Sequence, residues 1–387
     1  MASNIISMAM SLGKLFKRLI GRARKALPSV HVRTWGSDPS GPNNTSAVIK
    51  AIGLAKLATR PAPATIIFLH YHPSEFFAPG YIQLIQSAQA CGYRVLVVSS
   101  ARPSRAKKHL GDFECVYIQR ENIGYDFGAL RDARESLAKH GLLTDTRYVI
   151  INSSLINIAS KGFGHDPILD RLAEPENDID LLGVTSSFEQ RTYHIQSYFY
   201  SFSARLFCSS DLDNYLKRYW LGLSVQQSKM KARDYAIKNG ELGLCSFVLK
   251  NGYSATSLFE HLHLPCTDTF AAMESLRMDI QDNISKKCFP DSLPGSWAGS
   301  IHPSFMTEWW SKPGLQANMS QACWALLLLN RFMFIKRELL ENYQPHNHCH
   351  ARSACSMLMP VLRSLEVEIP SWSDLHVLNR LVFASRP

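Results

Sequence analysis

The chain has 387 residues, of which 46% are hydrophobic and 10% aromatic, and it carries a formal net charge of +10. This length and apolar content suffice for one large folded domain or two ordinary ones. The longest apolar runs, such as Ile66 to Leu69, are too short for the ~20 residues of a membrane-spanning helix. The excess of positive charge predicts an anionic partner, which can be a lipid surface, a nucleic acid or a phosphorylated small molecule.

The first 30 residues combine large apolar side chains, from Ile5 to Ile20, with six lysines and arginines, from Lys14 to Lys25, and no acid. Such a segment can lie on an anionic membrane surface. Equally, it can form a helix that packs on the domain and exposes a basic face. It does not read as a secretory signal, because the charges follow the apolar residues. We expect a cytoplasmic protein, with peripheral attachment to the inner membrane as one of the two interpretations.

Predicted elements then follow in chain order. Residues 28–63 are rich in Gly, Pro, Asn and Ser, which indicates a linker around one helix at about 45–58. From Thr65 onward, buried β-branched runs alternate with helical patterns. We predict strands at 65–72, 93–101, 114–120, 147–154, 178–187 and 193–207, and helices at 80–91, 126–140, 211–220 and 240–251. This alternation predicts an α/β fold with a doubly wound, mostly parallel sheet.

The domain organisation follows from the same pattern. We expect a basic amphipathic segment and linker over residues 1–62, the sheet-bearing domain over 63–265, and a mainly helical C-terminal subdomain over 266–387. Helices are predicted in the last part near 319–330 and 354–364, the second one kinked or broken at Pro360.

Cysteine and histidine usage bears on metal binding. The nine cysteines form no CxxC pair and several lie inside apolar runs, which predicts a reducing compartment and no zinc site. The cluster His346, His348, Cys349 and His350 can be read as a metal site, but its position after a proline favours a loop.

The segment IQRENIGYDFGALRDA, residues 118–133, places Gly124 and Gly128 between a predicted strand and a predicted helix. In an open α/β sheet, ligands collect at the carboxyl ends of the strands. Glycines there permit close backbone approach, and the positive end of a helix suits a diphosphate or a sugar. A tight turn with Asp126 as the helix N-cap accounts for the same residues without any ligand.

The RENIGYDFGALRDA stretch resembles the signature of the rhamnan synthesis protein F family, whose members are assigned as polysaccharide glycosyltransferases. Five further segments resemble the family in its order, and together they span about Thr65 to Asn342: YVIINSSLIN, YHIQSYFYSF, GELGLCSFVLKNGY, HPSF and FMFIKRELL. The resemblance implies an enzyme that transfers a sugar, rhamnose in the first place. The donor would be a nucleoside-diphosphate sugar and the acceptor a growing surface polysaccharide such as O-antigen, capsule or rhamnan.

A broader resemblance is to family 2 glycosyltransferases with the GT-A fold. These carry an Asn-x-Gly loop followed by a strand that ends in an Asp-x-Asp-type motif, at a spacing similar to that from Asn122 to Asn152. The resemblance implies a GT-A-like sheet. It also implies a donor-binding set made of Asn122, Gly124, Tyr125, Asp126, Asn152, Ser153 and Ser154.

The chain departs from that pattern where a metal would be held. Magnesium and manganese favour carboxylate oxygens, whereas Asn152, Ser153 and Ser154 offer amide, hydroxyl and backbone oxygens. Three explanations stay open: Asp126 or Asp180 supplies a carboxylate, cationic side chains replace the divalent cation, or the protein has lost catalytic power. The cationic candidates are Lys161, Arg131, Arg191 and Lys336.

An inverting transfer needs a base for the acceptor hydroxyl. Glu241 is the first candidate because it follows Asn239 and Gly240 at an expected helix start, although a first-turn Glu can merely complement the helix dipole. Asp126 is the second candidate. Candidate acceptor or sugar-binding residues are His194, Gln196, Tyr198 and Lys336, of which the first two should face one side of a strand. A buried histidine bonded to a carbonyl is the competing interpretation of His194.

The sequence leaves two alternative functions to consider. A catalytically inactive relative that binds a nucleotide-sugar or glycan would explain the absence of an aspartate at Ser153. Nucleic-acid binding is suggested by the charge alone, and no helix-turn-helix, RNP-like or zinc-finger pattern accompanies it. We therefore expect no nucleic-acid partner.

Overall fold

The computed structural model describes residues 47–58, 62–72, 75–110, 116–144, 146–157, 167–187, 192–226, 232–259, 319–322 and 324–337, together with 339, 358 and 362. All of them belong to one compact unit, Ser46–Pro387. The basic N-terminal segment and residues 260–318 lie outside the described residues, and so does most of the helix predicted at 354–364. No helix in the described part of the chain is long and apolar enough to cross a membrane.

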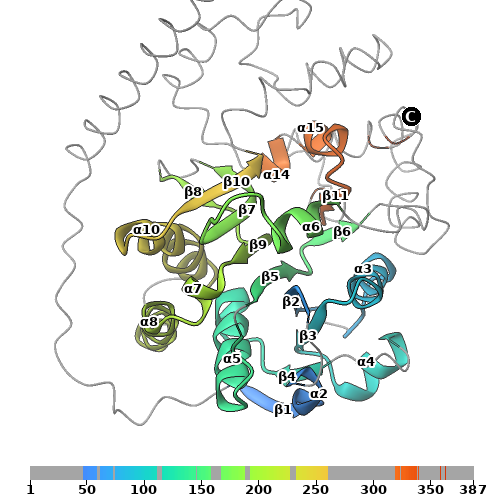
Figure 1. Ribbon diagram of the computed structural model, residues 1–387. Coiled ribbons are helices and arrows are strands. Elements are labelled where there is room, and N and C mark those ends of the chain that lie inside the picture. Colours follow the sequence, from blue (N-terminus) through green and yellow to red (C-terminus); the bar gives the residue numbers. More distant parts are fainter. Residues whose placement is uncertain are drawn as a thin grey trace, which may run out of the picture. The chain divides into compact units, whose positions relative to one another are not determined.

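A central sheet, seen in Figure 1, has the strand order β1-β4-β3-β2-β5-β9-β7-β10, with β8 paired to β7. The pairs β4–β3, β3–β2, β2–β5 and β7–β10 are parallel, whereas β1, β8 and β9 run antiparallel to their neighbours. The sheet is therefore mostly parallel, as predicted. The strands are β1 (Val48–Ile52), β2 (Ala64–His70), β3 (Arg94–Ser99), β4 (Val116–Arg120), β5 (Arg147–Asn152), β7 (Leu181–Ser187), β8 (His194–Ile195), β9 (Phe199–Phe202) and β10 (Ala255–Phe259).

Helices cover both faces of this sheet (Figure 1). One apolar core lies under α3 (Pro79–Ala90), α4 (Pro103–Leu110) and α6 (Pro167–Ala173). The other lies under α5 (Tyr125–Lys139), α7 (Ala204–Phe207), α8 (Ser210–Gln226) and α10 (Leu242–Lys250). Because both faces are covered, β2 and β5 are buried along their whole length, which explains their nearly continuous apolar sequences.

The strand order reverses next to β2. The chain runs from β2 to β3 to β4 toward one edge, and β5 then pairs with the other side of β2. Such a switch point opens a crevice at the carboxyl ends of the parallel strands, where ligands bind in sheets of this class. The loops that follow β2, β4 and β5 therefore converge on one edge of the sheet.

The described part of the C-terminal region packs on this body. It contains α14 (Met319–Ala322), α15 (Trp324–Leu329) and β11 (Phe334–Lys336), and β11 pairs antiparallel with β6 (Leu155–Asn157) in a second, two-stranded sheet. Trp324 and Phe332 are buried in the core that α3 and α6 share. The helix predicted at 319–330 is thus found as α14 and α15.

Two element predictions are wrong in part. The helix expected at about 45–58 is limited to α2 (Leu54–Ala58), because Gly53 adopts a φ of 76° and the residues before it form β1. The strand expected over 193–207 divides into β8, β9 and α7, since the Ser203 hydroxyl accepts a bond from the amide of Leu206 and caps a helix there. β1 also belongs to the sheet, although we expected the sheet-bearing domain to begin after Pro63.

Candidate active site

The loop after β4 and the first turn of α5 carry four of the predicted donor-binding residues. Asn122 and Tyr125 are exposed, and Gly124 is buried with a φ of 75°. Gly124 is the N-cap residue of α5 and supplies no side chain, so the alternative interpretation of Asp126 as the N-cap is wrong. Asp126 stands in the first turn instead. Its carboxylate is therefore available to another partner.

Hydrogen bonds and close packing hold the loop after β4 against the start of α5. The buried Arg120 donates from Nε to Asp132 Oδ2 at 2.8 Å and from Nη2 to the carbonyl of Ile123 at 2.5 Å. A Cβ added at Gly128 would stand 2.3 Å from that same carbonyl oxygen. Gly128 is thus required for the approach of the loop to α5.

Asp126 meets Asn152, the last residue of β5. The Asn152 amide donates from Nδ2 to Asp126 Oδ2 at 2.7 Å, and to the carbonyl of Ser197 at 3.3 Å. Its Oδ1 accepts from the backbone amide of Ser154 at 3.0 Å and from the Ser154 hydroxyl. These partners fix which end of the amide faces the carboxylate. Two predicted residues that are 26 positions apart are therefore joined directly.

The environment of Asp126 suits a proton acceptor. Burial raises the pKa of Asp126 to about 6, the hydrogen bond from Asn152 opposes that shift, and the charge of Glu241 adds to it. The charges of Arg120 and Lys336 act on it in the lowering direction. A carboxylate with a pKa near neutrality is ionised at pH 7 and still basic enough to take a proton.

Glu241 lies near this carboxylate, at a junction between two kinds of helix. It is the last residue of a π-helix, η2 (Ala236–Glu241), which continues directly into α10, so the interpretation as a first-turn residue is wrong. Glu241 Oε1 accepts from the amide of Ser197 at 3.2 Å. A Cβ at Gly240 would stand 2.3 Å from the ring of Phe127, which shows how closely η2 approaches the start of α5. π-Helical turns of this kind are frequent at functional sites.

The three predicted sugar-binding residues on 194–198 are buried. His194 Nε2 lies 3.9 Å from Glu241 Oε1, and its Nδ1 lies 2.9 Å from the carbonyl of Thr192. Gln196 Oε1 accepts from the Thr185 hydroxyl at 2.7 Å and from the amide of Ser320 at 3.2 Å.

Tyr198 completes this group. Its hydroxyl lies 2.6 Å from the Thr185 hydroxyl, and the Lys336 ammonium stands 5.5 Å from its ring centre. Among His194, Gln196 and Tyr198, His194 approaches the carboxylate of Glu241, whereas the other two are bonded inside the protein. Their role in sugar binding stays a prediction.

The residues at the implied metal position do not fit a divalent cation. Asn152 turns its amide nitrogen toward Asp126, and its oxygen is occupied by Ser154. The Ser153 hydroxyl bonds to both the amide and the carbonyl of Tyr71, at 3.0 and 3.1 Å. Within the described ranges, no three His, Cys, Asp or Glu side chains are grouped as metal ligands.

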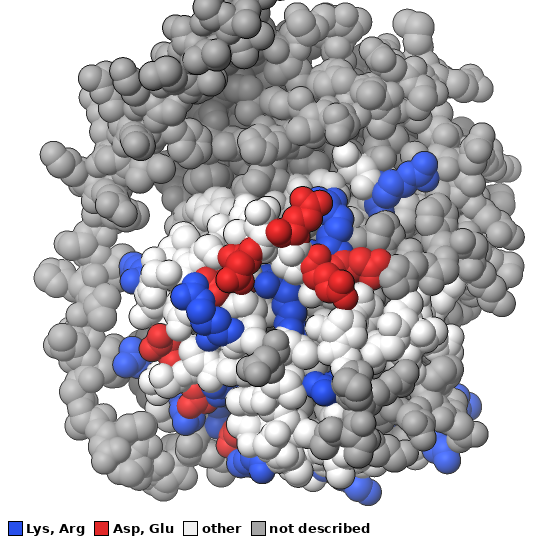
Figure 2. All heavy atoms as spheres, viewed as in Figure 1, with Lys and Arg blue, Asp and Glu red and all other residues white. Residues whose placement is uncertain are grey.

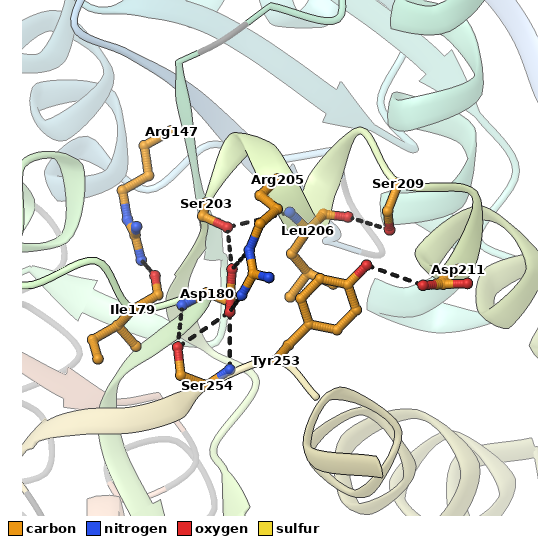
Figure 3. A network of polar contacts seen from close by, with 10 residues as sticks. All are labelled: Arg147, Ile179, Asp180, Ser203, Arg205, Leu206, Ser209, Asp211, Tyr253 and Ser254. Atoms are coloured by element: carbon orange, nitrogen blue, oxygen red, sulfur yellow. Dashed lines mark hydrogen bonds and ion pairs between the residues drawn. The ribbon is translucent and has the colours of Figure 1, made fainter. Parts of the chain in front are cut away.

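The other predicted residues either lie away from this edge of the sheet or fall outside the residues that the structure describes. Asp180 precedes β7, at the opposite end of the parallel strands, where it accepts from Ser203, Arg205 and Ser254 (Figure 3). It cannot supply a carboxylate to Asn152. Arg131 is buried and paired with Asp132 and Glu135. The remaining candidates lie outside the described residues: Lys161, Arg191, His346, His348, Cys349 and His350.

Comparison with known proteins supports the resemblance seen in the sequence. Residues 95–269 match the rhamnan synthesis protein F family. An uncharacterized protein of Sinorhizobium fredii, y4gN, is 27% identical over 197 residues, which are 50% of this chain and 48% of that protein. The chain thus spans about half the length of this curated relative.

Solved structures give weak similarities. A putative glucose-1-phosphate thymidylyltransferase from Bacillus anthracis is 12% identical with a TM-score of 0.30, over 50% of this chain and 87% of that one. A 4-diphosphocytidyl-2C-methyl-D-erythritol synthase is 15% identical with a TM-score of 0.31, over 51% and 88%.

The rhamnan synthesis protein F match contains Asp126, Asn152, His194 and Glu241, and it ends before Lys336. Sequence reasoning missed Arg120, which is buried at the end of β4 and secures the loop. It also missed Arg337, whose amide donates to the carbonyl of Ser154 at 2.8 Å. A charged residue directly at the end of a predicted buried strand was the available signal for Arg120.

Proposed function

We propose that this protein is a glycosyltransferase that uses a nucleoside-diphosphate sugar and has a GT-A-like arrangement of its site. The observation that carries the proposal is the hydrogen bond between Asp126 and Asn152 at the switch-point edge of the sheet. It joins the loop that the family signature marks to the strand end expected to face the donor. The family match over residues 95–269 supports the same class of reaction.

The proposed reaction is a single displacement at the anomeric carbon. The acceptor hydroxyl loses its proton to a carboxylate as its oxygen bonds to the anomeric carbon. The bond from that carbon to the diphosphate oxygen breaks, and the nucleoside diphosphate leaves with the electron pair. We assign this proton to Asp126 or Glu241, two carboxylates that lie close enough for the charge of Glu241 to raise the pKa of Asp126.

The proposal also specifies the sugar that is transferred and the acceptor that receives it. The similarity to the rhamnan synthesis protein F family favours rhamnose as the sugar and a growing surface polysaccharide as the acceptor. Attachment of the basic N-terminal segment to an anionic membrane would place the site near lipid-linked glycans.

A donor panel tests this function. We would incubate the purified full chain with nucleoside-diphosphate hexoses and deoxyhexoses, rhamnose donors among them, and glycan acceptors, and measure released nucleoside diphosphate and extended glycan. Asp126→Asn and Glu241→Gln should each lower turnover by about 100-fold or more if that residue is the base. Glu176→Gln, an exposed change away from the site, should leave it unchanged. Full transfer by both carboxylate variants would show that the base is misassigned, and no turnover of any donor would refute the enzyme.

A catalytically inactive relative is the second candidate, and one observation favours it. The oxygens of Asn152 and Ser153 are taken up by internal hydrogen bonds, so the usual place for a metal lacks ligands. Such a protein would bind a nucleotide-sugar and leave it intact. Saturable donor binding without turnover, in the presence and absence of manganese, would identify it.

A further inference from the structure

The mismatch at the implied metal position raises the question of what balances the charge of a bound diphosphate. This question rests on the proposed function, because a leaving nucleoside diphosphate is dianionic or more and needs cationic partners. Asn152 presents N–H donors and Ser153 bonds to backbone. Neither residue carries a positive charge, so the candidates are cationic side chains that another part of the chain brings to this place.

β11 brings two adjacent cations to this place. Lys336 pairs with Leu155 in the antiparallel ladder of β6 and β11, directly after the end of β5. The next residue, Arg337, donates its backbone amide to the carbonyl of Ser154 at 2.8 Å. Both side chains are half-buried. The end of β11 and the residue after it thus lie beside Ser154, at the position where a metal-binding carboxylate is otherwise expected.

Lys336 extends toward the carboxylate side of the site. Its ammonium stands 5.5 Å from the ring centre of Tyr198. Its charge also acts on Asp126. It is therefore close to the groups proposed to activate the acceptor.

The charge of Arg337 acts on groups near the carboxyl end of β2. The Tyr81 hydroxyl donates to the carbonyls of Leu69 and Ile151, each at 3.1 Å, so it marks the switch point itself. Burial and the charge of Asp126 raise the pKa of Tyr81, and Arg337 opposes that shift. Burial and Arg337 together lower the pKa of His72, which follows β2. The charge of Arg337 thus reaches His72 and Tyr81, and its backbone is bonded to Ser154.

We propose that Lys336 and Arg337 take the place of a divalent cation, binding the diphosphate of the donor and neutralising the nucleoside diphosphate as it leaves. Arginine offers a bidentate fork for phosphate oxygens, and lysine contributes a compact charge. Together they supply two positive charges, which equals the charge of one magnesium or manganese ion. Diphosphate binding then requires no metal.

Calorimetry with inorganic pyrophosphate tests the pair on the full chain in excess EDTA. The wild-type protein should bind. Lys336→Gln and Arg337→Gln should each weaken binding by about 10-fold or more, as expected for the loss of a charge-assisted bond. Lys50→Gln, an exposed change on β1, should leave binding unchanged. Urea unfolding of each variant checks that it folds, and Arg337→Lys should retain part of the affinity if charge is what matters.

The outcomes separate this inference from the proposed function. No pyrophosphate binding in EDTA, binding that appears only with magnesium or manganese, or unchanged affinity in both folded variants would overturn the cation pair. Sugar transfer that stops in EDTA and returns with manganese would also overturn it, while leaving the glycosyltransferase in place. Metal-free binding lost in the variants, with no turnover of any donor, would support the pair and refute the enzyme.

Discussion

Asp126 and Asp180 are both removed from solvent to a large extent, but their surroundings move their acidity in opposite directions. Asp126 has one hydrogen bond from a side-chain amide, and burial raises its pKa to about 6. Burial acts on Asp180 in the same sense, but hydrogen bonds from Arg205, Ser254 and Ser203 outweigh it and lower its pKa. A carboxylate that the fold stabilises is structural, whereas one that the fold leaves under-stabilised is a candidate for chemistry.

Asp126→Asn should therefore stabilise the protein at neutral pH. The folded pKa of about 6 exceeds the ordinary 3.8, so the stability cost of the carboxylate develops as pH rises from about 4 to about 6 and is complete at pH 7. A rise of two pKa units corresponds to at most ~3 kcal/mol. Urea unfolding at pH 7 should show a gain toward that limit, and the gain should shrink as pH falls toward 4. A loss of stability at pH 7 would mean that the carboxylate is structural.

Asp180→Asn should have the opposite effect. Asp180 is buried and accepts from Ser203, from the amide and hydroxyl of Ser254 and from Arg205 (Figure 3). Replacing an oxygen by an amino group sets donor against donor, at a cost of about 1–3 kcal/mol. Because its folded pKa is lowered, the stabilisation is present above the ordinary aspartate pKa and is lost as pH falls through the lowered value. The same unfolding series measures this, and equal stability of variant and wild type at pH 7 would contradict it.

At the scale of elements, the π-helix η2 is what brings Glu241 to the site. Its close approach to α5 requires a glycine, since a Cβ at Gly240 would lie 2.3 Å from the ring of the buried Phe127. Gly240→Ala should force the two helices apart at a cost of about 1–3 kcal/mol. It should also draw Glu241 away from the amide of Ser197 and lower transfer more than stability alone explains.

Paired measurements check this prediction. Turnover and urea midpoints of Gly240→Ala are compared with those of Lys238→Ala, an exposed change in the same π-helix. Only the glycine variant should lose activity at temperatures where both are folded. Unchanged turnover in folded Gly240→Ala would show that the position of η2 does not govern the base.

The sequence predicted elements best where burial is continuous. β2 and β5 are buried on both faces, so their sequences are nearly continuous apolar runs that are easily recognised as strands. Residues 48–52 are mostly exposed, and they form a strand by pairing with the edge of β4, which is a long-range contact. The π-helical turn before α10 was not predicted either, and its close contact with Phe127, more than 100 residues earlier, is not visible in the local sequence pattern.

The sequence predicted that Asp126 and Asn152 lie near each other, but it did not predict the contacts that their atoms make. The rule that ligands gather at carboxyl ends of strands places Asp126 and Asn152 on one edge, and the structure joins them. The rule does not reveal which atoms of Asn152 face inward, because that depends on the amide of Ser154. Nor does it bring Arg337 to Ser154, since the β6–β11 pairing links residues about 180 positions apart, from Phe334–Lys336 to Leu155–Asn157.

At the scale of the whole molecule, the positive charge is unevenly distributed along the chain. Six lysines and arginines without an acid lie between Lys14 and Lys25, so this short segment supplies most of the net charge of +10. On the face shown in Figure 2, the lysines and arginines of the described residues are interspersed with aspartates and glutamates. The anionic partner expected from composition is therefore best sought in two places, the N-terminal segment and the diphosphate site.

A flotation comparison tests the N-terminal part of that division. The full chain should float with vesicles that contain anionic lipid, and a variant that begins at Ser29 should not, because each lysine or arginine near such a surface contributes about 1 kcal/mol. Vesicles of neutral lipid are the control, and they should retain only what the apolar residues contribute. Raising the salt to about 1 M, where the Debye length falls to about 3 Å, should reduce flotation of the full chain to its level on neutral vesicles. Equal flotation of the two proteins would assign the segment to packing on the domain instead, because a helix whose apolar face is already buried has nothing left to insert into lipid.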